Sequence, residues 1–348
     1  MSSSPESPTV PSPPVGVAVL GCGRVSDAHL EAIRTRPAFG RLEAVIDTDP
    51  SRAESAASRH GAPRALTSLD AALEIDAIEA IVVCLPNHLH GEPAIAALNA
   101  GRHVLVEKPM ADSAEEAARM GRAAELNTKV LAIGQSRRHT RAIRYVADNL
   151  ATFGRLRALQ ESFCIRWDGP QTPWWAERTR EQGLVLSLIA PHSLDFVQLI
   201  MGADDPLRVH AESVRHRSEW QADDEAMILL RYPHERLVSV HLSYNQRPHF
   251  DRKVLLFDGC VVEIEDDFVV RVDGKTVVEP GEGELAEMAR PALQFTWQFE
   301  EFAKAVRGLP NRSVLHPEGV RLMHTVDAAK RAALTGETQT LTRVPGGE

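Results

Sequence analysis

Residues 15–26 (VGVAVLGCGRVS) have the residue types and the spacing of a turn that binds phosphate. An apolar run leads into Gly21 and Gly23, and a helix-compatible segment begins near Ser26. This order predicts a buried strand, a tight turn and a helix N-terminus. The first N–H groups of a helix lack partners within it, and the helix dipole adds partial positive charge there. Because glycines leave that backbone open, the turn predicts a site for the pyrophosphate of a dinucleotide.

Asp47 follows a second apolar run, residues 42–46, and lies about 20 residues beyond the glycines. A dinucleotide fold places an acid at this position, where it binds the adenosine ribose. In the alternative interpretation, Asp47 only caps a helix that begins near Pro50. A carboxylate here repels a 2′-phosphate, and Thr48 rather than arginine follows it. The sequence therefore favours NAD over NADP, although Arg52, one helical turn further on, is a cation within reach of such a phosphate.

Alternating strand and helix patterns must position these residues. They predict an α/β fold class, with an N-terminal doubly wound parallel sheet whose ligands bind beyond the carboxyl ends of the strands. After the opening unit, the expected strands are residues 42–46, 78–85, 103–106 and 130–133, and the expected helices are residues 50–60, 88–100 and 113–126. Two further strand ends carry polar groups, Leu85-Pro86-Asn87 and Glu107-Lys108-Pro109. A lysine in a cofactor cleft has a tunable pKa, whereas a lysine at an ordinary strand end is solvated.

The pattern changes near residue 138 and becomes rich in alternating strands. A large, mostly antiparallel open sheet is expected from residues 155–167, 207–217, 226–231, 237–244 and 253–272, with helices at residues 140–149, 192–201, 293–307 and 317–334. We therefore expect a disordered tail over residues 1–14 and a Rossmann domain over residues 15–137. The substrate-binding and oligomerisation α/β domain then spans residues 138–348, with C-terminal helices that can pack back on the first domain.

Composition narrows the classes of function. The net charge of −9 argues against broad binding of nucleic acid or anionic membranes. No apolar run reaches membrane-spanning length, and the Ser- and Pro-rich N-terminus does not have the pattern of a secretory signal. The four scattered cysteines predict neither a metal site nor a disulfide framework, which favours a reduced cytoplasm as the compartment.

These residues together resemble the glucose-fructose oxidoreductase / inositol dehydrogenase / MocA family of nicotinamide-dependent oxidoreductases. The resemblance covers nearly everything after the tail. Its carriers are AVLGCGR at residues 18–24 with His29, LPNHLH at residues 85–90 in place of the family's T-P-N-x-x-H, EKP at residues 107–109 and HSLD at residues 192–195. It implies a homodimer or homotetramer formed through the open sheet face.

The resemblance also implies roles for individual residues. At the pyrophosphate, the implied cofactor positions are Gly21, Cys22, Gly23, Arg24 and Val25, and at the adenosine ribose Asp47, with Arg52 nearby. Along the middle of the cofactor and the nicotinamide ribose they are Leu85, Pro86, Asn87 and His90, and at the nicotinamide end they are Glu107 and Lys108. Lys108 and His192 would face the carbon that exchanges hydride, with Asp195 either orienting the His192 ring or only supporting helix packing.

The implied reaction moves a hydride between the nicotinamide and a secondary alcohol or ketone of a sugar, amino sugar or cyclitol. His192 suits the role of base, and Lys108 suits stabilisation of the alkoxide. Relatives that act as inositol dehydrogenases carry an aspartate four residues before the histidine, where this chain has Leu188. An NAD-dependent glycoside hydrolase and a catalytically silent, nicotinamide-binding regulatory protein therefore stay open as alternatives.

Substrate selection is expected from the second domain. Arg138 follows the last Rossmann strand, and Trp174 and Trp175 lie in a loop rich in proline and glycine. Aromatic faces suit the C–H faces of sugar rings, and arginine suits hydroxyls or an anionic group. In the alternative, the tryptophans are core or interface residues.

Overall fold

The structure, a computed structural model, describes residues 12–172, 174–175, 183–281 and 292–341. The chain divides into two compact units: unit 1 comprises Met1–Ser136 and Ala289–Gly319, and unit 2 comprises Arg137–Met288 and Val320–Glu348. Residues 1–11 of the expected tail lie outside the described residues. Across the described part of the chain, no helix has the length and apolar character needed to cross a membrane.

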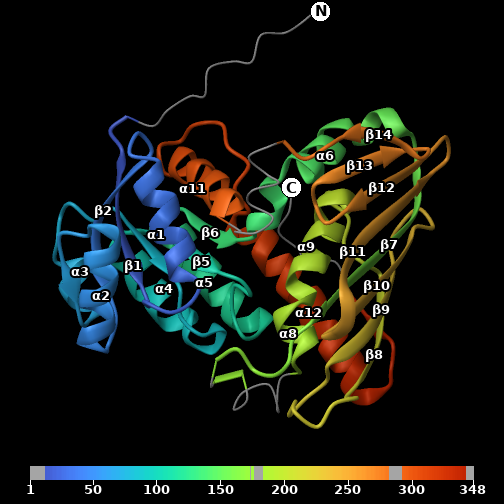
Figure 1. The fold of residues 1–348 in the computed structure, drawn as a ribbon, viewed down its shortest axis with the longest axis horizontal. Coiled ribbons are helices and arrows are strands. Elements are labelled where there is room, and N and C mark those ends of the chain that lie inside the picture. The colour runs from blue at the N-terminus through green and yellow to red at the C-terminus, as the bar shows by residue number, and fades with distance from the viewer. Residues whose placement is uncertain (1–11, 173, 176–182, 282–291, 342–348) are drawn as a thin grey trace, which may run out of the picture. The chain divides into compact units, whose positions relative to one another are not determined.

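Unit 1 contains a six-stranded parallel sheet in the order β3-β2-β1-β4-β5-β6 (Figure 1). The strands are β1 (Val15–Leu20), β2 (Gly40–Ile46), β3 (Ala65–Leu66), β4 (Ala80–Val83), β5 (His103–Glu107) and β6 (Leu131–Gly134). The helices are α1 (Ser26–Thr35), α2 (Pro50–His60), α3 (Leu69–Leu73), α4 (Gly91–Asn99), α5 (Ala114–Leu126) and α11 (Ala292–Val306), with a 3₁₀ turn, η1 (Asn87–Leu89). This sheet confirms the predicted doubly wound architecture.

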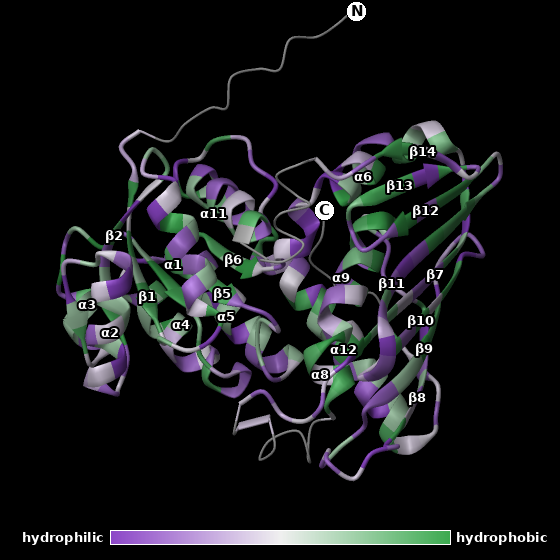
Figure 2. Cartoon of the chain, in the orientation of Figure 1, coloured by the Kyte–Doolittle hydropathy of each residue, from purple (hydrophilic) through white to green (hydrophobic). Residues whose placement is uncertain are grey.

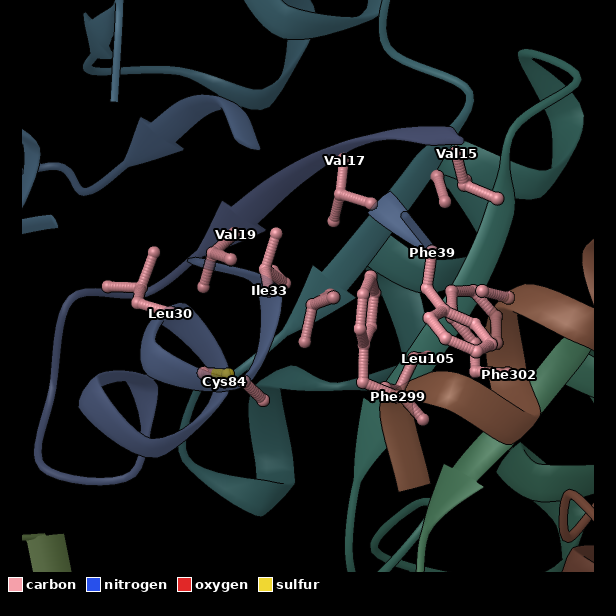
Figure 3. Close-up of a cluster of buried hydrophobic side chains, with 14 of the residues drawn as sticks. Val15, Val17, Val19, Leu30, Ile33, Phe39, Cys84, Leu105, Phe299 and Phe302 are labelled. Carbon is pink, nitrogen blue, oxygen red and sulfur yellow. The ribbon is translucent and has the colours of Figure 1, made fainter. Parts of the chain in front are cut away.

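The core of unit 1 explains why these strands are continuous apolar runs. Every residue of β1 is buried, as expected for a strand that is covered on both faces. In Figure 3 the valines of β1 lie near Leu30 and Ile33 of α1, and near Phe299 and Phe302 of α11. The segment that returns after residue 288 therefore completes this core, although more than 250 residues separate it from β1.

Unit 2 contains a nine-stranded sheet in the order β14-β13-β12-β11-β7-β10-β9-β8-β15. The strands are β7 (Leu156–Arg166), β8 (Arg208–Val214), β9 (Glu225–Arg231), β10 (Leu237–Ser243), β11 (Asn245–Phe257), β12 (Val261–Glu265), β13 (Val269–Val272), β14 (Lys275–Val278) and β15 (Gln339–Thr340). The helices are α6 (Arg141–Phe153), α8 (Val185–Leu188), α9 (Ala190–Met201) and α12 (His316–Thr335), which begins in unit 1; η2 (Ser136–His139) is a 3₁₀ turn. The sheet is mostly antiparallel, as predicted, and β7 and β10 form a parallel pair within it.

One face of this sheet is covered and the other is open. Helices α8 and α9 contact strands β7, β9 and β10, and α6 contacts β13 and β14. In β9, buried residues alternate with exposed ones such as Met227 and Leu229. Figure 2 shows this alternation as changes between green and purple along the strands of unit 2, whereas the central strands of unit 1 are largely green. The period of two therefore reflects one buried face and one open face.

Proline and aspartate account for the boundaries that the sequence placed differently. A single helix over residues 88–100 would need Pro93 to donate a backbone hydrogen bond, which proline cannot do. The structure instead has η1 and then α4, with Pro93 in the first turn of α4. Similarly, Pro191 lies in the first turn of α9, which begins at Ala190 rather than at His192. The run predicted over residues 253–272 is broken twice, between β11 and β12 and again at Asp266 and Asp267, both of which have positive φ.

Candidate functional site

The glycine turn follows β1 with the geometry that a phosphate cradle requires. Gly21 has φ of +91°, and its N–H donates to Ile46 O at 2.8 Å. A Cβ at Gly21 would lie 2.8 Å from the Cys84 carbonyl oxygen, whereas a Cβ at Gly23 would meet nothing within 4 Å. The Ser26 hydroxyl donates to Gly23 O at 2.6 Å and closes the turn onto α1. Gly21 is therefore required by the backbone, and Gly23 leaves one side of the turn open.

Asp47 holds this turn in place. Its Oδ2 accepts from Cys22 N at 2.8 Å, and its Oδ1 accepts from Asp49 N at 3.0 Å. The residue that caps α2 is Asp49, whose side chain accepts from Ser51 N, so the interpretation of Asp47 as the helix cap is wrong. Arg52 lies 3.6 Å from Asp49 Oδ2. Burial, followed by the charge of Asp47, raises the pKa of the Cys22 thiol to about 11.

The loop after β4 turns two of its polar side chains inward. Asn87 is 4% exposed and donates to Asp112 Oδ1 at 3.0 Å. The buried ring of His90 lies between two carbonyl oxygens, with Nδ1 2.8 Å from Pro109 O and Nε2 2.8 Å from Leu85 O. Burial lowers the pKa of His90, and a neutral ring donates from only one nitrogen. His90 thus ties the loop after β4 to the loop after β5.

Glu107 and Lys108 lie at the end of β5. Glu107, the last residue of the strand, is 6% exposed; its Oε1 is 2.8 Å from His29 Nε2, and its Oε2 accepts from Lys108 N at 3.1 Å. Burial acts to raise the pKa of Glu107, but the hydrogen bond and charge of His29 and the charge of Lys108 hold it below its ordinary value. Lys108 is half-buried. The role of Glu107 at the nicotinamide end stays a prediction.

In unit 2, His192 lies in the first turn of α9. Its ring meets the Phe163 ring edge-on, with ring centroids 6.4 Å apart. One turn further on, Asp195 Oδ2 accepts from Arg138 Nε at 2.7 Å, and both side chains are at least nine-tenths buried. A small cavity in unit 2 is lined by His192, Asp195 and Arg138 together with Lys253 and Asp267. The proposed roles of Asp195 toward His192 and of Arg138 toward substrate stay predictions.

A buried ionic network beside His192 was missed by the sequence analysis. Lys253 Nζ lies 2.7 Å from both Asp251 Oδ1 and Asp267 Oδ1, and 3.6 Å from Glu161 Oε1. Arg137 pairs with the same two aspartates. Burial raises the pKa of Glu161, whereas the charges of Arg137 and Lys253 hold the pKa of Asp267 low despite its burial. A lysine on a strand of alternating polar and apolar residues is expected to be solvated, so the sequence pattern gave no indication that Lys253 is buried.

The tryptophans belong to an aromatic cluster in unit 2. Trp175 is 8% exposed and stacks on Tyr244, with ring centroids 6.3 Å apart. Trp174 and Trp167 meet Trp175 edge-on. Trp175 is thus packed as the core interpretation expects, and Trp174 is half-buried. Contact of either ring with a substrate stays a prediction.

Leu188, which stands at the position where inositol dehydrogenases carry an aspartate, is the last residue of α8 and is 6% exposed. Among the residues that the structure describes, no group of three or more His, Cys, Asp or Glu side chains is arranged to hold a metal ion.

A parallel doubly wound sheet with a glycine turn after β1 and an acid after β2 defines unit 1 as a dinucleotide-binding fold. Residues 15–135 match the family described as "Oxidoreductase family, NAD-binding Rossmann fold", and residues 143–259 match "GFO/IDH/MocA C-terminal domain". The chain belongs to this Gfo/Idh/MocA family, and the resemblance seen in the sequence is confirmed.

Three comparisons show the range of its relatives. The chain is 25% identical over 308 residues to 1,5-anhydro-D-fructose reductase of Ensifer adhaerens, covering 87% of this chain and 91% of that enzyme. It is 30% identical to 4-carboxy-2-hydroxymuconate-6-semialdehyde dehydrogenase of a Sphingobium species, but over only 38% of this chain and 42% of that enzyme. The crystal structure of the WlbA dehydrogenase from Bordetella pertussis, in complex with NADH and UDP-GlcNAcA, superposes with a TM-score of 0.79 at 23% identity, covering 95% of this chain and all of that one.

Proposed function

We propose that this protein is an NAD(H)-dependent dehydrogenase or ketoreductase that acts on a secondary alcohol or ketone of a sugar, amino sugar or cyclitol. The observation that carries the proposal is the set of groups following four neighbouring parallel strands. The glycine turn follows β1, Asp47 follows β2, Leu85 and Pro86 follow β4, and Lys108 follows β5. Carboxyl ends of parallel strands share one edge of a sheet, which is where such folds bind their ligands.

The residues present fit NAD as the cofactor. The open side of Gly23 and the α1 N-terminus suit a pyrophosphate, and the Asp47 carboxylate suits ribose hydroxyls while repelling a 2′-phosphate. When bound, the nicotinamide accepts or donates the hydride. We infer that NAD(H) binds more tightly than NADP(H). A fluorescence titration with both reduced cofactors tests this, and equal or reversed affinities would contradict the role of Asp47.

The chain's own residues handle the proton and the developing charge. His192 takes the hydroxyl proton as hydride leaves the alcohol, because an imidazole titrates near neutral pH. The Lys108 ammonium stabilises the negative charge that develops on the same oxygen. Reduction of a ketone uses the same groups in the opposite direction. Lys108 belongs to unit 1 and His192 to unit 2.

A neutral, polyhydroxylated ring is the substrate class that unit 2 supports best. Arg137 and Arg138 each pair with buried carboxylates of unit 2. Arginines that are neutralised in this way present little net charge to an anionic substrate, whereas ring hydroxyls need only hydrogen-bonding groups and an apolar surface. The Ensifer relative, a reductase of an anhydro sugar by its name, fits this class.

The test is turnover measured by nicotinamide absorbance with a panel of cyclitols, sugars and amino sugars. Lys108→Met should lower kcat by a factor of about 100 or more while leaving NADH affinity nearly unchanged, since the lysine acts on the reacting oxygen. Lys129→Met, a change at a lysine just before β6 in the same unit, is the matched control and should behave like the parent. Full activity of Lys108→Met would remove this lysine from the mechanism.

The burial of Leu188 favours one second candidate, a nicotinamide-binding protein without catalysis. A leucine supplies no carboxylate to support a histidine base, and this one is packed in the interior with 6% exposure. In that case NADH would bind, no substrate of the panel would turn over, and Lys108→Met would change nothing. Turnover that disappears with Lys108→Met would exclude it.

We also propose that the open face of the nine-stranded sheet binds a second copy of this chain. Met227 and Leu229 of β9 and Leu237 of β10 are each more than half exposed on that face, and large apolar side chains grouped in this way mark protein interfaces. Light scattering after gel filtration should show a dimer or tetramer, and Leu229→Lys should shift it toward the monomer. A parent protein that is monomeric at all concentrations would contradict this assignment.

A further inference from the structure

The Glu107 carboxylate is held tightly inside unit 1. Both of its oxygens have partners: Oε1 meets His29 Nε2 at 2.8 Å, and Oε2 accepts from the backbone N–H of Lys108 at 3.1 Å. The neighbouring strand β6 leaves room for it, because a Cβ at Gly134 would lie 2.8 Å from Glu107 Oε1. An almost fully buried carboxylate that is aimed at one histidine is costly unless it is paired, so its fixed orientation depends on that partner.

His29 is fixed from the other side. It lies on α1, is 1% exposed, and meets Phe295 of α11 edge-on, with ring centroids 4.9 Å apart. Its helix is the one whose N-terminus follows the glycine turn. The pair therefore runs from the helix expected to bind pyrophosphate to the backbone of the residue expected to act on substrate. The hydrogen bond from Lys108 N to Glu107 Oε2 connects this pair to the backbone of the lysine.

We propose that His29 and Glu107 are positioning residues for Lys108: His29 holds the Glu107 carboxylate against the backbone at the end of β5, so that the lysine keeps a fixed place beside a fixed negative charge. This inference rests on the proposed function, in which Lys108 acts on the substrate. Neither residue touches substrate in this account. Glu107 acts through Lys108, and His29 acts through Glu107.

Few other titratable groups face this carboxylate. Within unit 1 they are His29 from α1, Cys84 from the end of β4 and His90 from the segment before α4, with Lys108 next in the chain. Burial raises the pKa of the Cys84 thiol and lowers the pKa of His90, so both stay neutral near neutral pH. Among the described groups that act on Glu107, His29 is therefore the direct side-chain partner that holds this carboxylate beside Lys108.

The test measures the protonation of Lys108 directly, without a substrate. The parent and variants are labelled over a range of pH with a trace of an amine-acylating reagent, and the peptide of residues 103–119, released by cleavage at arginine, is quantified. Lys108 is the only lysine in that peptide. Removing an adjacent negative charge in Glu107→Gln should lower the labelling midpoint of Lys108 by about one pH unit. It should lower kcat by a factor of about 10 to 100 through misplacement.

His29 supplies the second pair of variants. His29→Gln keeps a hydrogen-bond donor toward Glu107 and should retain the parental midpoint, whereas His29→Leu removes the donor and should shift the midpoint in the direction of Glu107→Gln. The matched control is Glu79→Gln. It breaks the two-bond pair of Glu79 with Arg307 in the same unit, with both distances 2.7 Å, and Glu79 precedes β4 at the opposite end of the strands. The control should lose stability without moving the Lys108 midpoint.

A parental Lys108 midpoint in Glu107→Gln, or an equal shift in Glu79→Gln, would overturn the inference and leave His29–Glu107 as a core ion pair. If Glu107→Gln does not fold, the comparison of His29→Leu with His29→Gln decides in the same way. Absence of turnover in the parent would count against the proposed function alone, since the labelling result does not depend on it.

Discussion

The two glycines of the turn after β1 should respond to alanine in opposite ways. Gly21 has φ of +91°, and an added Cβ would lie 2.8 Å from a backbone oxygen, whereas a Cβ at Gly23 would meet nothing within 4 Å and no positive φ opposes it. Gly23→Ala should therefore leave the apo protein as stable as the parent, or more stable by about 0.4–1 kcal/mol because the unfolded chain loses freedom. Gly21→Ala should destabilise it.

The size of the Gly21 effect follows from two contributions. A non-glycine residue in the left-handed region costs about 1–2 kcal/mol, and a methyl group forced against the Cys84 backbone adds about 1–3 kcal/mol of overpacking. Gly61 isolates the first contribution, because it has φ of +72° at the end of α2 and no atom within 4 Å of its Cβ position. Unfolding in urea should rank the variants as Gly23→Ala most stable, Gly61→Ala next and Gly21→Ala least stable.

Cofactor affinity should follow a different order. A methyl group on the open side of Gly23 would stand where the pyrophosphate approaches, so Gly23→Ala should weaken NADH binding by a factor of 10 or more, a loss of about 1.4 kcal/mol, although its fold is intact. Gly61→Ala should bind NADH like the parent. Parental affinity in Gly23→Ala would refute the assignment of this turn as the phosphate site. Equal stability of Gly21→Ala and Gly61→Ala would refute the steric argument at Gly21.

Three further predictions concern stability. Phe299→Ala, at a ring that is 1% exposed in the core of unit 1, should cost about 3–5 kcal/mol in denaturant unfolding, and a loss below 1 kcal/mol would mean that α11 contributes little to that core. Burial raises the pKa of Asp223 to about 6, above its unfolded value of about 3.9. Its contribution to stability is therefore most favourable at low pH and is lost as pH rises through about 6. Asp223→Asn should flatten the pH dependence of the urea midpoint between these two pKa values. Lys253→Met leaves Asp251 and Asp267 paired with Arg137 alone among the described residues and should cost about 3–5 kcal/mol, whereas an unchanged midpoint would show that the network relaxes freely.

Local patterns were enough to predict the framework of unit 1. The expected helix over residues 50–60 coincides with α2, because Pro50 and the caps Asp49 and Gly61 are all local signals. The glycine turn and Asp47 were found from their spacing, since a βαβ unit fixes both the turn and the neighbouring strand end. The predicted helix boundary near Pro93 was wrong because a helix there would need a backbone N–H that proline lacks. A periodic pattern of apolar residues does not show that missing donor.

Side-chain direction was beyond the reach of the sequence. Spacing placed Asn87, His90 and Glu107 just after or at strand ends, but the structure turns all three inward, onto Asp112, two carbonyl oxygens and His29. A residue at a strand end can face the ligand or the layer beneath it. The choice depends on partners far away in the chain, and Glu107 lies 78 residues from His29.

The ionic network of unit 2 could not be predicted from the sequence for the same reason: several of its partners are far apart in the chain. Arg137 lies just before Arg138, which was expected to select substrate, but the carboxylate partners of Arg137 lie 114 and 130 residues further along the chain. Lys253 and Arg137 both pair there with Asp251 and Asp267, and burial raises the pKa of the nearby Glu161. This network lies beside α9, the helix that carries His192, and its two cations are paired with carboxylates. Because Arg137 and Arg138 are both paired with carboxylates, recognition of the proposed sugar, amino sugar or cyclitol is expected to depend on hydroxyl hydrogen bonds more than on charge.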